Sequence, residues 1–280
     1  MILDGKIVAA DIKQRLKQEI DTAVASGLRQ PHLVIIPVGD DPASKVYVRN
    51  KIKACEECGI FVTHSAHNED VSFYHIIGLI DYCNQNPFID GIMVQLPLPK
   101  GWDERIIIDT IDPSKDVDGL TTTNIGRLRS GQQCLKPCTA AGIIDLCKYY
   151  HIELDGTNVT IIGRSNIVGK PLTDMMMAEG ATVTQCHTHT SDLMFHTLTA
   201  DIIISAVGKP KLITEKMIKC GAIVIDVGIN RDENGKLCGD VDYENVRVVA
   251  EHITPVPGGV GPMTVAELMS NTVDSWRKRI

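Results

Sequence analysis

Two residues four positions apart, Tyr47 and Lys51, form the pair in this sequence best suited to proton transfer. They lie in the segment SKVYVRNKIK (residues 44–53), whose pattern favours a helix. A spacing of four places both side chains on one helical face. A lysine held beside a phenol can exchange protons near neutral pH when it is partly buried. An exposed helix with several solvated lysines explains the same spacing, so the pair needs support from the rest of the chain.

A second candidate site follows the predicted strand NVTIIG (158–163). The sequence continues as GRSNIVGKP (163–171) into a predicted helix. Gly163 and Gly169 would let backbone N–H groups approach a phosphate at the helix N-terminus, with Ser165 where a middle glycine is usual. The spacing departs from G-x-G-x-x-G, so a plain turn between a strand and a helix remains an alternative.

The next predicted strand favours NADP over NAD. Folds that bind NAD place an acidic residue about 20 positions after the glycines, whereas this strand ends in QCHTHT (185–190), without a carboxylate. Arg164 lies in the turn, and its guanidinium, with Thr188 or His187, suits a 2′-phosphate. For His189 we prefer the interpretation that it is a polar residue in contact with solvent at the end of the strand.

Two further strand ends support a nucleotide site. They are SAVGKP (205–210) and DVGIN (226–230), and open α/β sheets bind ligands at this edge. Ordinary turns would also use their glycines. The candidate cofactor residues here are Val207, Gly208, Gly228 and Ile229.

Strands and helices alternate along the chain, which predicts parallel sheets. In the first half we expect strands at 32–39, 61–66 and 90–96, helices at 6–26 and 72–85, and a helix carrying Tyr47 and Lys51 that ends at Gly59; loop signals dominate from 97 to about 119. In the second half we expect strands at 158–163, 181–186, 201–208 and 222–228, and helices at 139–150, 168–179 and 262–278. The natural domain boundary lies near residue 120.

Composition excludes several classes of protein. The chain has 280 residues, of which 44% are apolar, enough for one large or two ordinary domains. Its net charge of -7 is spread along the chain and argues against a nucleic-acid surface. There is no apolar run of about 18 residues and no signal-peptide pattern at the N-terminus. We therefore expect a cytoplasmic protein that binds neither membranes nor nucleic acids.

The nine cysteines do not predict a disulfide framework, because the chain is long and their number is odd. Cys55 and Cys58 form a CxxC that could be half of a zinc site or a redox pair. No second pair stands at the usual spacing, and this pair falls late in a predicted helix. Ordinary reduced thiols are the preferred interpretation.

Four segments together resemble a known family: YVRNKIKA (47–54), GIMVQLPLP (91–99), PSKDVDG (113–119) and PVPGGVGPMT (255–264). With PCTAAG (137–142) and GRSNIVGKP, they resemble the bifunctional methylenetetrahydrofolate dehydrogenase/methenyltetrahydrofolate cyclohydrolase family. The likeness covers nearly the whole chain, in order, at the spacing of the short bacterial-type members.

The resemblance implies oxidation of 5,10-methylenetetrahydrofolate by NADP+, followed by hydrolysis of the methenyl product to 10-formyltetrahydrofolate. Lys51 would be the proton-transfer group and Gln95 would hold it by a hydrogen bond. Tyr47 would stack along the folate's aminobenzoate ring and help to position Lys51. Asp118 would bind the pterin's aminopyrimidine edge. The folate pocket would be lined by Pro257, Gly258 and Gly259.

The resemblance also implies an α/β fold of two domains with a cleft between them. Residues 1–119 would form an α/β folate-binding catalytic domain, with the C-terminal helix (about 265–280) packing back on it. Residues 120–264 would form a Rossmann-type NADP-binding domain. A homodimer is expected, joined through the nucleotide-binding domains, and no metal ion.

Three alternatives remain open. A member of the family could carry only one of the two activities, although Lys51, Gln95 and Asp118 together favour both. A two-domain NADP dehydrogenase of small hydroxy acids would share the architecture but would not explain PVPGGVGPMT. A zinc-dependent interaction module would be built on Cys55 and Cys58.

Overall fold

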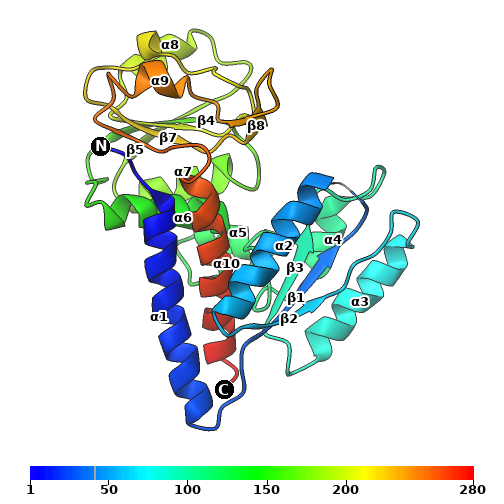
Figure 1. The fold of residues 1–280 in the computed structure, drawn as a ribbon. Coiled ribbons are helices and arrows are strands. Elements are labelled where there is room, and N and C mark those ends of the chain that lie inside the picture. The colour runs from blue at the N-terminus through cyan, green and yellow to red at the C-terminus, as the bar shows by residue number, and fades with distance from the viewer. Residues whose placement is uncertain (41) are drawn as a thin grey trace. The chain divides into compact units, whose positions relative to one another are not determined.

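The fold is given by a computed structural model, which describes residues 1–40 and 42–280. Its contacts divide the chain into two compact units (Figure 1). After the roles that the sequence predicts for them, we call Asp11–Cys138 with Val265–Ile280 the catalytic unit, and Met1–Ala10 with Thr139–Thr264 the nucleotide unit. Two long helices, α1 (Gly5–Ala25) and α10 (Val260–Arg277), contribute residues to both.

The catalytic unit contains a three-stranded parallel sheet with strand order β2-β1-β3. The strands are β1 (His32–Pro37), β2 (Phe61–His64) and β3 (Gly91–Gln95). Helix α2 (Pro42–Glu57) connects β1 to β2, and α3 (Phe73–Gln85) connects β2 to β3. The sequence predicted each of these elements. Parallel neighbours require such crossovers, which explains the alternation of strand and helix.

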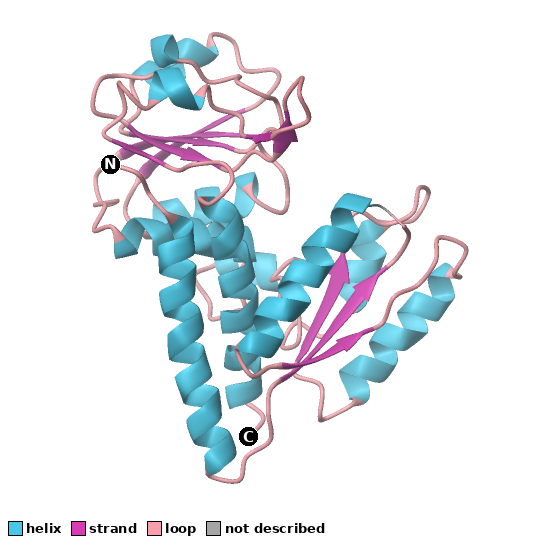
Figure 2. Cartoon of the chain, viewed as in Figure 1, coloured by secondary structure: helices cyan, strands magenta, loops and turns pink. Residues whose placement is uncertain are grey.

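The three strands of this sheet are drawn in magenta in Figure 2. Successive side chains of β1 and β3 point to opposite faces of the sheet. One face packs against the apolar side of α3 and of α4 (Glu104–Thr110) in a cluster that includes Val34, Ile36, Ile92, Val94, Ile76, Ile80 and Ile107. Met93 and Gln95 therefore point to the other face, where Lys51 of α2 contacts both. This alternation decides which β3 residues can meet the lysine.

Two short helices fall where loop signals dominate or where no element was predicted. Helix α4 (Glu104–Thr110) begins at Asp103, whose side chain accepts a hydrogen bond from the Arg105 N–H. The prediction of loop from 97 to 119 is wrong over these residues. Helix α5 (Thr122–Arg129) begins at Thr121, which accepts from the Asn124 N–H. Both use the capping that starts helices, but each is too short to show a clear apolar period.

The nucleotide unit contains a five-stranded parallel sheet with strand order β10-β7-β6-β4-β5. Its strands are β4 (Asn158–Ile162), β5 (Thr182–Cys186), β6 (Ile202–Ser205), β7 (Ile223–Asp226) and β10 (His252–Ile253). The chain passes from β4 outward to β5 and then returns to the other side of β4 for β6. This reversal of strand order is the point where doubly wound sheets bind ligands.

Helices cover the sheet of the nucleotide unit on both faces (Figure 1). They are α6 (Cys138–Tyr149), α7 (Gly169–Ala178), α8 (Leu193–Leu198), α9 (Tyr243–Val246) and the 3-10 helix Glu215–Met217. A small hairpin, β8 (Asn230–Arg231) with β9 (Leu237–Cys238), follows β7. None of the helices in the described part of the chain combines the length and hydrophobicity of a membrane-spanning segment.

Candidate active site

Lys51 and Gln95 meet in the catalytic unit. The Lys51 amino group donates a hydrogen bond of 3.1 Å to the Gln95 Oε1, and it lies 3.7 Å from the Met93 sulfur. The Gln95 Nε2 donates in turn to the Leu96 carbonyl at 2.6 Å. Because the amide nitrogen already has an acceptor, the amide oxygen is the end that faces the lysine.

Tyr47 lies one helical turn before Lys51 on α2, as the spacing predicts. Its side chain is 41% exposed, which leaves the ring open to a ligand. Lys51 itself is partly buried against the sheet. The structure therefore brings the phenol and the amine to the same helical face, with Gln95 fixing the amine from the sheet.

Asp118 lies close enough to Lys51 to interact with it electrostatically. Burial raises the pKa of the Asp118 carboxyl, the Lys51 charge opposes this rise, and the nearby Asp116 adds to it. A partly buried carboxylate beside an ammonium offers acceptor oxygens in surroundings poor in water. Such a group suits a ligand that presents N–H donors.

Asp116 anchors the loop that carries Asp118. Its carboxylate accepts hydrogen bonds from the backbone N–H groups of Leu120 and Thr121, and from the Asn124 side chain at 2.9 Å. Asp116 is almost fully buried, and all of these partners come from the start of α5 or the turn before it. The arrangement fixes the backbone on both sides of Asp118.

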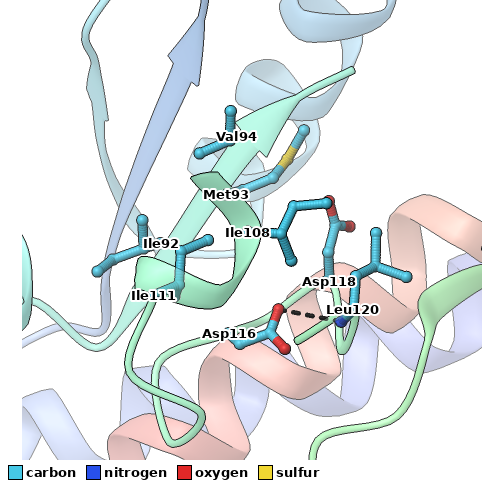
Figure 3. Close-up of a pocket in the computed structure, with 8 residues that line it drawn as sticks. All are labelled: Ile92, Met93, Val94, Ile108, Ile111, Asp116, Asp118 and Leu120. Atoms are coloured by element: carbon cyan, nitrogen blue, oxygen red, sulfur yellow. Dashed lines mark hydrogen bonds between the residues drawn. The ribbon is translucent and has the colours of Figure 1, made fainter. Parts of the chain in front are cut away.

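A pocket opens between β3 and this loop (Figure 3). Figure 3 shows the two aspartates on the loop that borders it and the apolar side chains of β3 along the other wall. Its lining residues are Ile92, Met93, Val94, Ile108, Ile111, Asp116, Asp118 and Leu120. The pocket is smaller than the cavities of about 300–1,000 Å³ that hold drug-sized ligands, so it marks only the place where the aspartates of the loop meet apolar side chains of β3.

Helix α10 supports the Asp118 loop from the other side. The Asn271 side chain donates to the carbonyls of Val117 and Lys136, each at 2.8 Å. The Cys138 thiol donates to the Val117 carbonyl at 3.2 Å, and it also hydrogen-bonds the Asp118 carboxyl. Sequence reasoning did not identify Asn271, Cys138, Met93 or Asp116. Only Met93 had a usable signal, because it stands two residues before Gln95 on one strand.

The predicted folate-pocket residues Pro257, Gly258 and Gly259 lie in the nucleotide unit, directly before α10. The Gly258 carbonyl accepts from the Gly5 N–H at 3.0 Å. Gly258 has a φ of 116°, which favours glycine. A Cβ on Gly5 would lie 1.9 Å from the Gly259 carbonyl oxygen, so this loop packs directly on the start of α1.

The predicted cofactor glycines make close backbone contacts at the carboxyl edge of the five-stranded sheet. Gly163 ends β4 with a φ of 122°, and a Cβ there would lie 2.4 Å from the Ala206 carbonyl oxygen. A Cβ on Gly169 would lie 2.2 Å from the Gly163 carbonyl oxygen. Ser165 accepts a hydrogen bond from the Val168 N–H at the start of α7. These residues fit a dinucleotide, because the two glycines lie at the N-terminus of the ten-residue helix α7 and have no side chains to keep a phosphate away from the backbone N–H groups.

The remaining predicted cofactor residues lie along the same edge. Arg164 is exposed in the turn after β4, and Thr188 is exposed two residues after β5. Val207 and Gly208 follow β6, whereas Gly228 and Ile229 follow β7. Since β4, β6 and β7 are neighbours in the sheet, their carboxyl ends present these residues along one line.

The CxxC cysteines are buried rather than presented to a ligand. Burial raises the pKa of the Cys55 thiol to about 12 and that of the Cys58 thiol to about 11. The Cys58 thiol donates to the Lys13 carbonyl. Zinc ligation and redox exchange both require a thiolate, which these surroundings oppose. Within the described residues, no group of three or more His, Cys, Asp or Glu side chains is arranged to hold a metal ion.

Comparison with known proteins gives one family over nearly the whole chain. The family model for the tetrahydrofolate dehydrogenase/cyclohydrolase catalytic domain matches residues 3–118, and that for the NAD(P)-binding domain matches residues 137–280. The chain is 50% identical to the bifunctional protein FolD of Agathobacter rectalis over 277 residues, which is 99% of each protein.

Solved structures of similar proteins indicate the same family. The bifunctional FolD enzyme from Campylobacter jejuni is 46% identical, with a TM-score of 0.98 over 100% of this chain and 99% of that one. FolD from Trypanosoma brucei, crystallised with NADP cofactor and an inhibitor, is 35% identical, with a TM-score of 0.94 over 99% and 97%. This chain belongs to the tetrahydrofolate dehydrogenase/cyclohydrolase family.

Proposed function

We propose that Lys51 is the proton-transfer group of a bifunctional enzyme. The protein oxidises 5,10-methylenetetrahydrofolate to the methenyl compound with NADP+, and it hydrolyses that compound to 10-formyltetrahydrofolate in one-carbon metabolism. The hydrogen bond from Lys51 to Gln95, beside the Asp118 carboxylate, is the observation that carries this proposal.

The hydrolytic step explains why a lysine is needed. The methenyl carbon belongs to a cationic amidinium, and water that attacks it must lose a proton. The Lys51 nitrogen is the group placed to take that proton, and the carboxylate of Asp118 stabilises the resulting ammonium. Gln95 holds the nitrogen in place through its amide oxygen, which accepts from an amine and from an ammonium alike.

In this proposal Asp118 recognises the pterin ring. An aminopyrimidine edge presents two N–H donors, and a carboxylate presents two acceptor oxygens. We further propose that Tyr47 stacks along the aminobenzoate ring, which its exposure on α2 permits. Pro257, Gly258 and Gly259 complete the folate pocket in this proposal.

NADP+ supplies the hydride acceptor when it is bound. Gly163, Ser165 and Gly169 form the turn that would hold the diphosphate, while Arg164 and Thr188 would bind the 2′-phosphate. Val207, Gly208, Gly228 and Ile229 would border the remainder of the cofactor. On this basis we assign residues 1–119 with 265–280 to folate chemistry and residues 120–264 to NADP binding, although by their contacts Met1–Ala10 group with the nucleotide unit and residues 120–138 with the catalytic unit.

We propose that the enzyme acts in the cytoplasm as a homodimer joined through its nucleotide-binding domains, in keeping with the resemblance of its sequence. Light scattering on the purified protein tests the assembly. A mass of two chains supports the dimer, and a mass of one chain contradicts it.

An absorbance assay tests both activities together. Tetrahydrofolate and formaldehyde generate the first substrate in solution, and cofactor reduction is followed with NADP+ and, separately, with NAD+. Decay of the methenyl chromophore then reports the hydrolysis. Reduction with NADP+ and decay faster than the spontaneous rate support the proposal. A protein that reduces the cofactor but leaves decay at the spontaneous rate would be a dehydrogenase alone.

A further inference from the structure

A buried carboxylate, Asp240, receives hydrogen bonds from the loop that follows β6. The backbone N–H groups of Val207 and Lys209 each donate to it at 2.8 Å, and that of Gly208 at 3.3 Å. The Ser205 hydroxyl donates at 3.1 Å from the end of β6 itself. Asp240 has no exposed surface. Three successive backbone N–H groups thus close around a single carboxylate.

The same carboxylate reaches the loop that follows β7. The Asn230 side chain donates to the Asp240 Oδ1 at 2.9 Å. A Cβ on Gly228 would lie 2.2 Å from that oxygen, so the backbone of this loop rests directly on the carboxylate. Asp240 therefore ties together the two loops that carry Val207, Gly208, Gly228 and Ile229.

A second buried carboxylate fixes Asp240 in its turn. The Asp226 Oδ1 accepts from the N–H groups of Gly228 at 3.0 Å and of Asp240 at 2.9 Å, and its Oδ2 accepts from Val241 at 2.9 Å. A Cβ on Gly239 would lie 1.8 Å from the Asp226 Oδ2. Gly239, which precedes Asp240, thus covers the Asp226 carboxylate, and Gly228, two residues after Asp226, covers the Asp240 carboxylate. No larger residue fits at either glycine.

We infer that Asp240 is a positioning residue for NADP+, which sets the two loops after β6 and β7 in the shape that receives the cofactor. This inference rests on the proposed function, because it takes those loops to be cofactor loops. It assigns to Asp240 no contact with the cofactor. Its five donors come from two segments, residues 205–209 and Asn230, and a carboxylate, which only accepts hydrogen bonds, satisfies all of them.

The arrangement also implies that the loops bind different parts of the cofactor. Successive backbone N–H groups of this kind bind anions. After β6 that position is already filled by the Asp240 carboxylate, whose negative charge repels a phosphate. The loop instead presents the exposed Val207 side chain, and Ile229 is exposed on the neighbouring loop. The charged diphosphate is therefore left to the turn at residues 163–169, and the two later loops suit an uncharged part of the cofactor.

The first test is the variant Asp240→Asn. The amide has one oxygen, so whichever way it lies, its NH2 group faces N–H donors that had an acceptor. We expect the Kd for NADP+, measured by calorimetry without folate, to rise roughly tenfold or more. The KM for NADP+ should rise with it, whereas hydrolysis of methenyltetrahydrofolate, assayed without NADP+, should keep its kcat. Glu244→Gln is the matched control, an exposed carboxylate four residues away that pairs with Arg247.

A milder variant protects the test against misfolding. Ser205→Ala removes one donor to Asp240 from a buried position, and we expect it to weaken NADP+ binding in the same direction by a smaller factor. If Asp240→Asn keeps the wild-type circular dichroism and the wild-type Kd, the inference is overturned. If Asp240→Asn does not fold, an unchanged Kd in Ser205→Ala overturns it. A wild-type protein that does not bind NADP+ at all would instead overturn the proposed function.

Discussion

Lys51 and Gln95 are joined by a 3.1 Å hydrogen bond from the amino group on helix α2 to the amide oxygen at the end of β3. The two residues are far apart in the chain, and the sheet geometry brings them together. Met93 and Gln95 share the face of β3 that α2 covers, so the lysine is held from one side by an apolar sulfur and an amide oxygen. Its remaining N–H positions are left for Asp118 and the substrate.

Replacing the proton-transfer group should abolish one activity without unfolding the protein. Lys51→Met keeps the length and apolar stem of the side chain but removes the amine. We expect the rate of methenyltetrahydrofolate hydrolysis to fall by about 10²–10⁴-fold, the usual contribution of a positioned acid or base. The measurement is the decay of the methenyl chromophore above its spontaneous rate. Lys53→Met, two residues along on the exposed side of α2, is the control. Wild-type hydrolysis by Lys51→Met would exclude the assignment.

Asp118 should make folate binding sensitive to acid. Burial raises the pKa of its carboxyl, and only the ionised form offers two acceptors to the pterin. Binding is therefore complete above that pKa and is lost as the pH falls through it. Asp118→Asn should weaken the substrate by about 10–100-fold, as expected for hydrogen bonds to a charged group, and should flatten this pH dependence. The check is the folate KM across a pH series for both proteins. If the folate KM of Asp118→Asn rises at low pH as it does in the wild type, another group is responsible for the pH dependence.

Arg164 should decide between the two nicotinamide cofactors. Its guanidinium is exposed in the turn after β4, where it can pair with a 2′-phosphate. We expect Arg164→Ala to weaken NADP+ by about tenfold or more and to leave NAD+ nearly unchanged. Kd values for both cofactors provide the measurement. Arg247→Ala, an exposed arginine on α9, is the control. Equal losses for NADP+ and NAD+ would show that Arg164 does not recognise the 2′-phosphate.

Sequence patterns predicted the elements that carry the site better than the contacts that build it. The spacing of Tyr47 and Lys51, the strand that ends in Gln95 and the strand that ends in Gly163 all follow from local periodicity and are confirmed. Helix α4 was missed because the prolines at 97 and 99 and the glycine at 101 suggest a long loop, while its seven residues show less than two full turns.

The carboxylates that shape the loops had no signal in the sequence. Asp240 stands in a turn-like segment, CGDVD, where an aspartate usually serves its own backbone. Its partners Val207 and Lys209 lie more than 30 residues away and reach it only when β6 and β7 pair. Asp116 is similar, since KDVDG does not indicate which aspartate faces inward. Local pattern cannot resolve such residues, because their role is set by tertiary contact.

Asp226 should give the nucleotide unit a stability that depends on pH. Burial raises the pKa of its carboxyl to about 6, and the neighbouring Asp240 charge adds to the rise, against a value of 3.8 in an ordinary setting. A raised folded-state pKa means that the fold prefers the protonated form. The protonated carboxyl therefore contributes about 3 kcal/mol to the free energy of unfolding below pH 3.8. This stabilisation declines as the pH rises to about 6 and is absent above that pH.

The variant Asp226→Asn cannot titrate at this position. Its melting temperature is therefore expected to lie furthest below that of the wild type near pH 4, with the gap narrowing by several degrees up to about pH 6 and constant beyond. Thermal unfolding of both proteins from pH 4 to 8 measures this gap, with Glu233→Gln, an exposed carboxylate of the β8–β9 hairpin, as the control. A gap that stays constant over the whole series would mean that Asp226 is ionised at every pH tested. The carboxylate pair would then be held as two charges, and the hydrogen bonds from Gly228, Asp240 and Val241 would outweigh its burial.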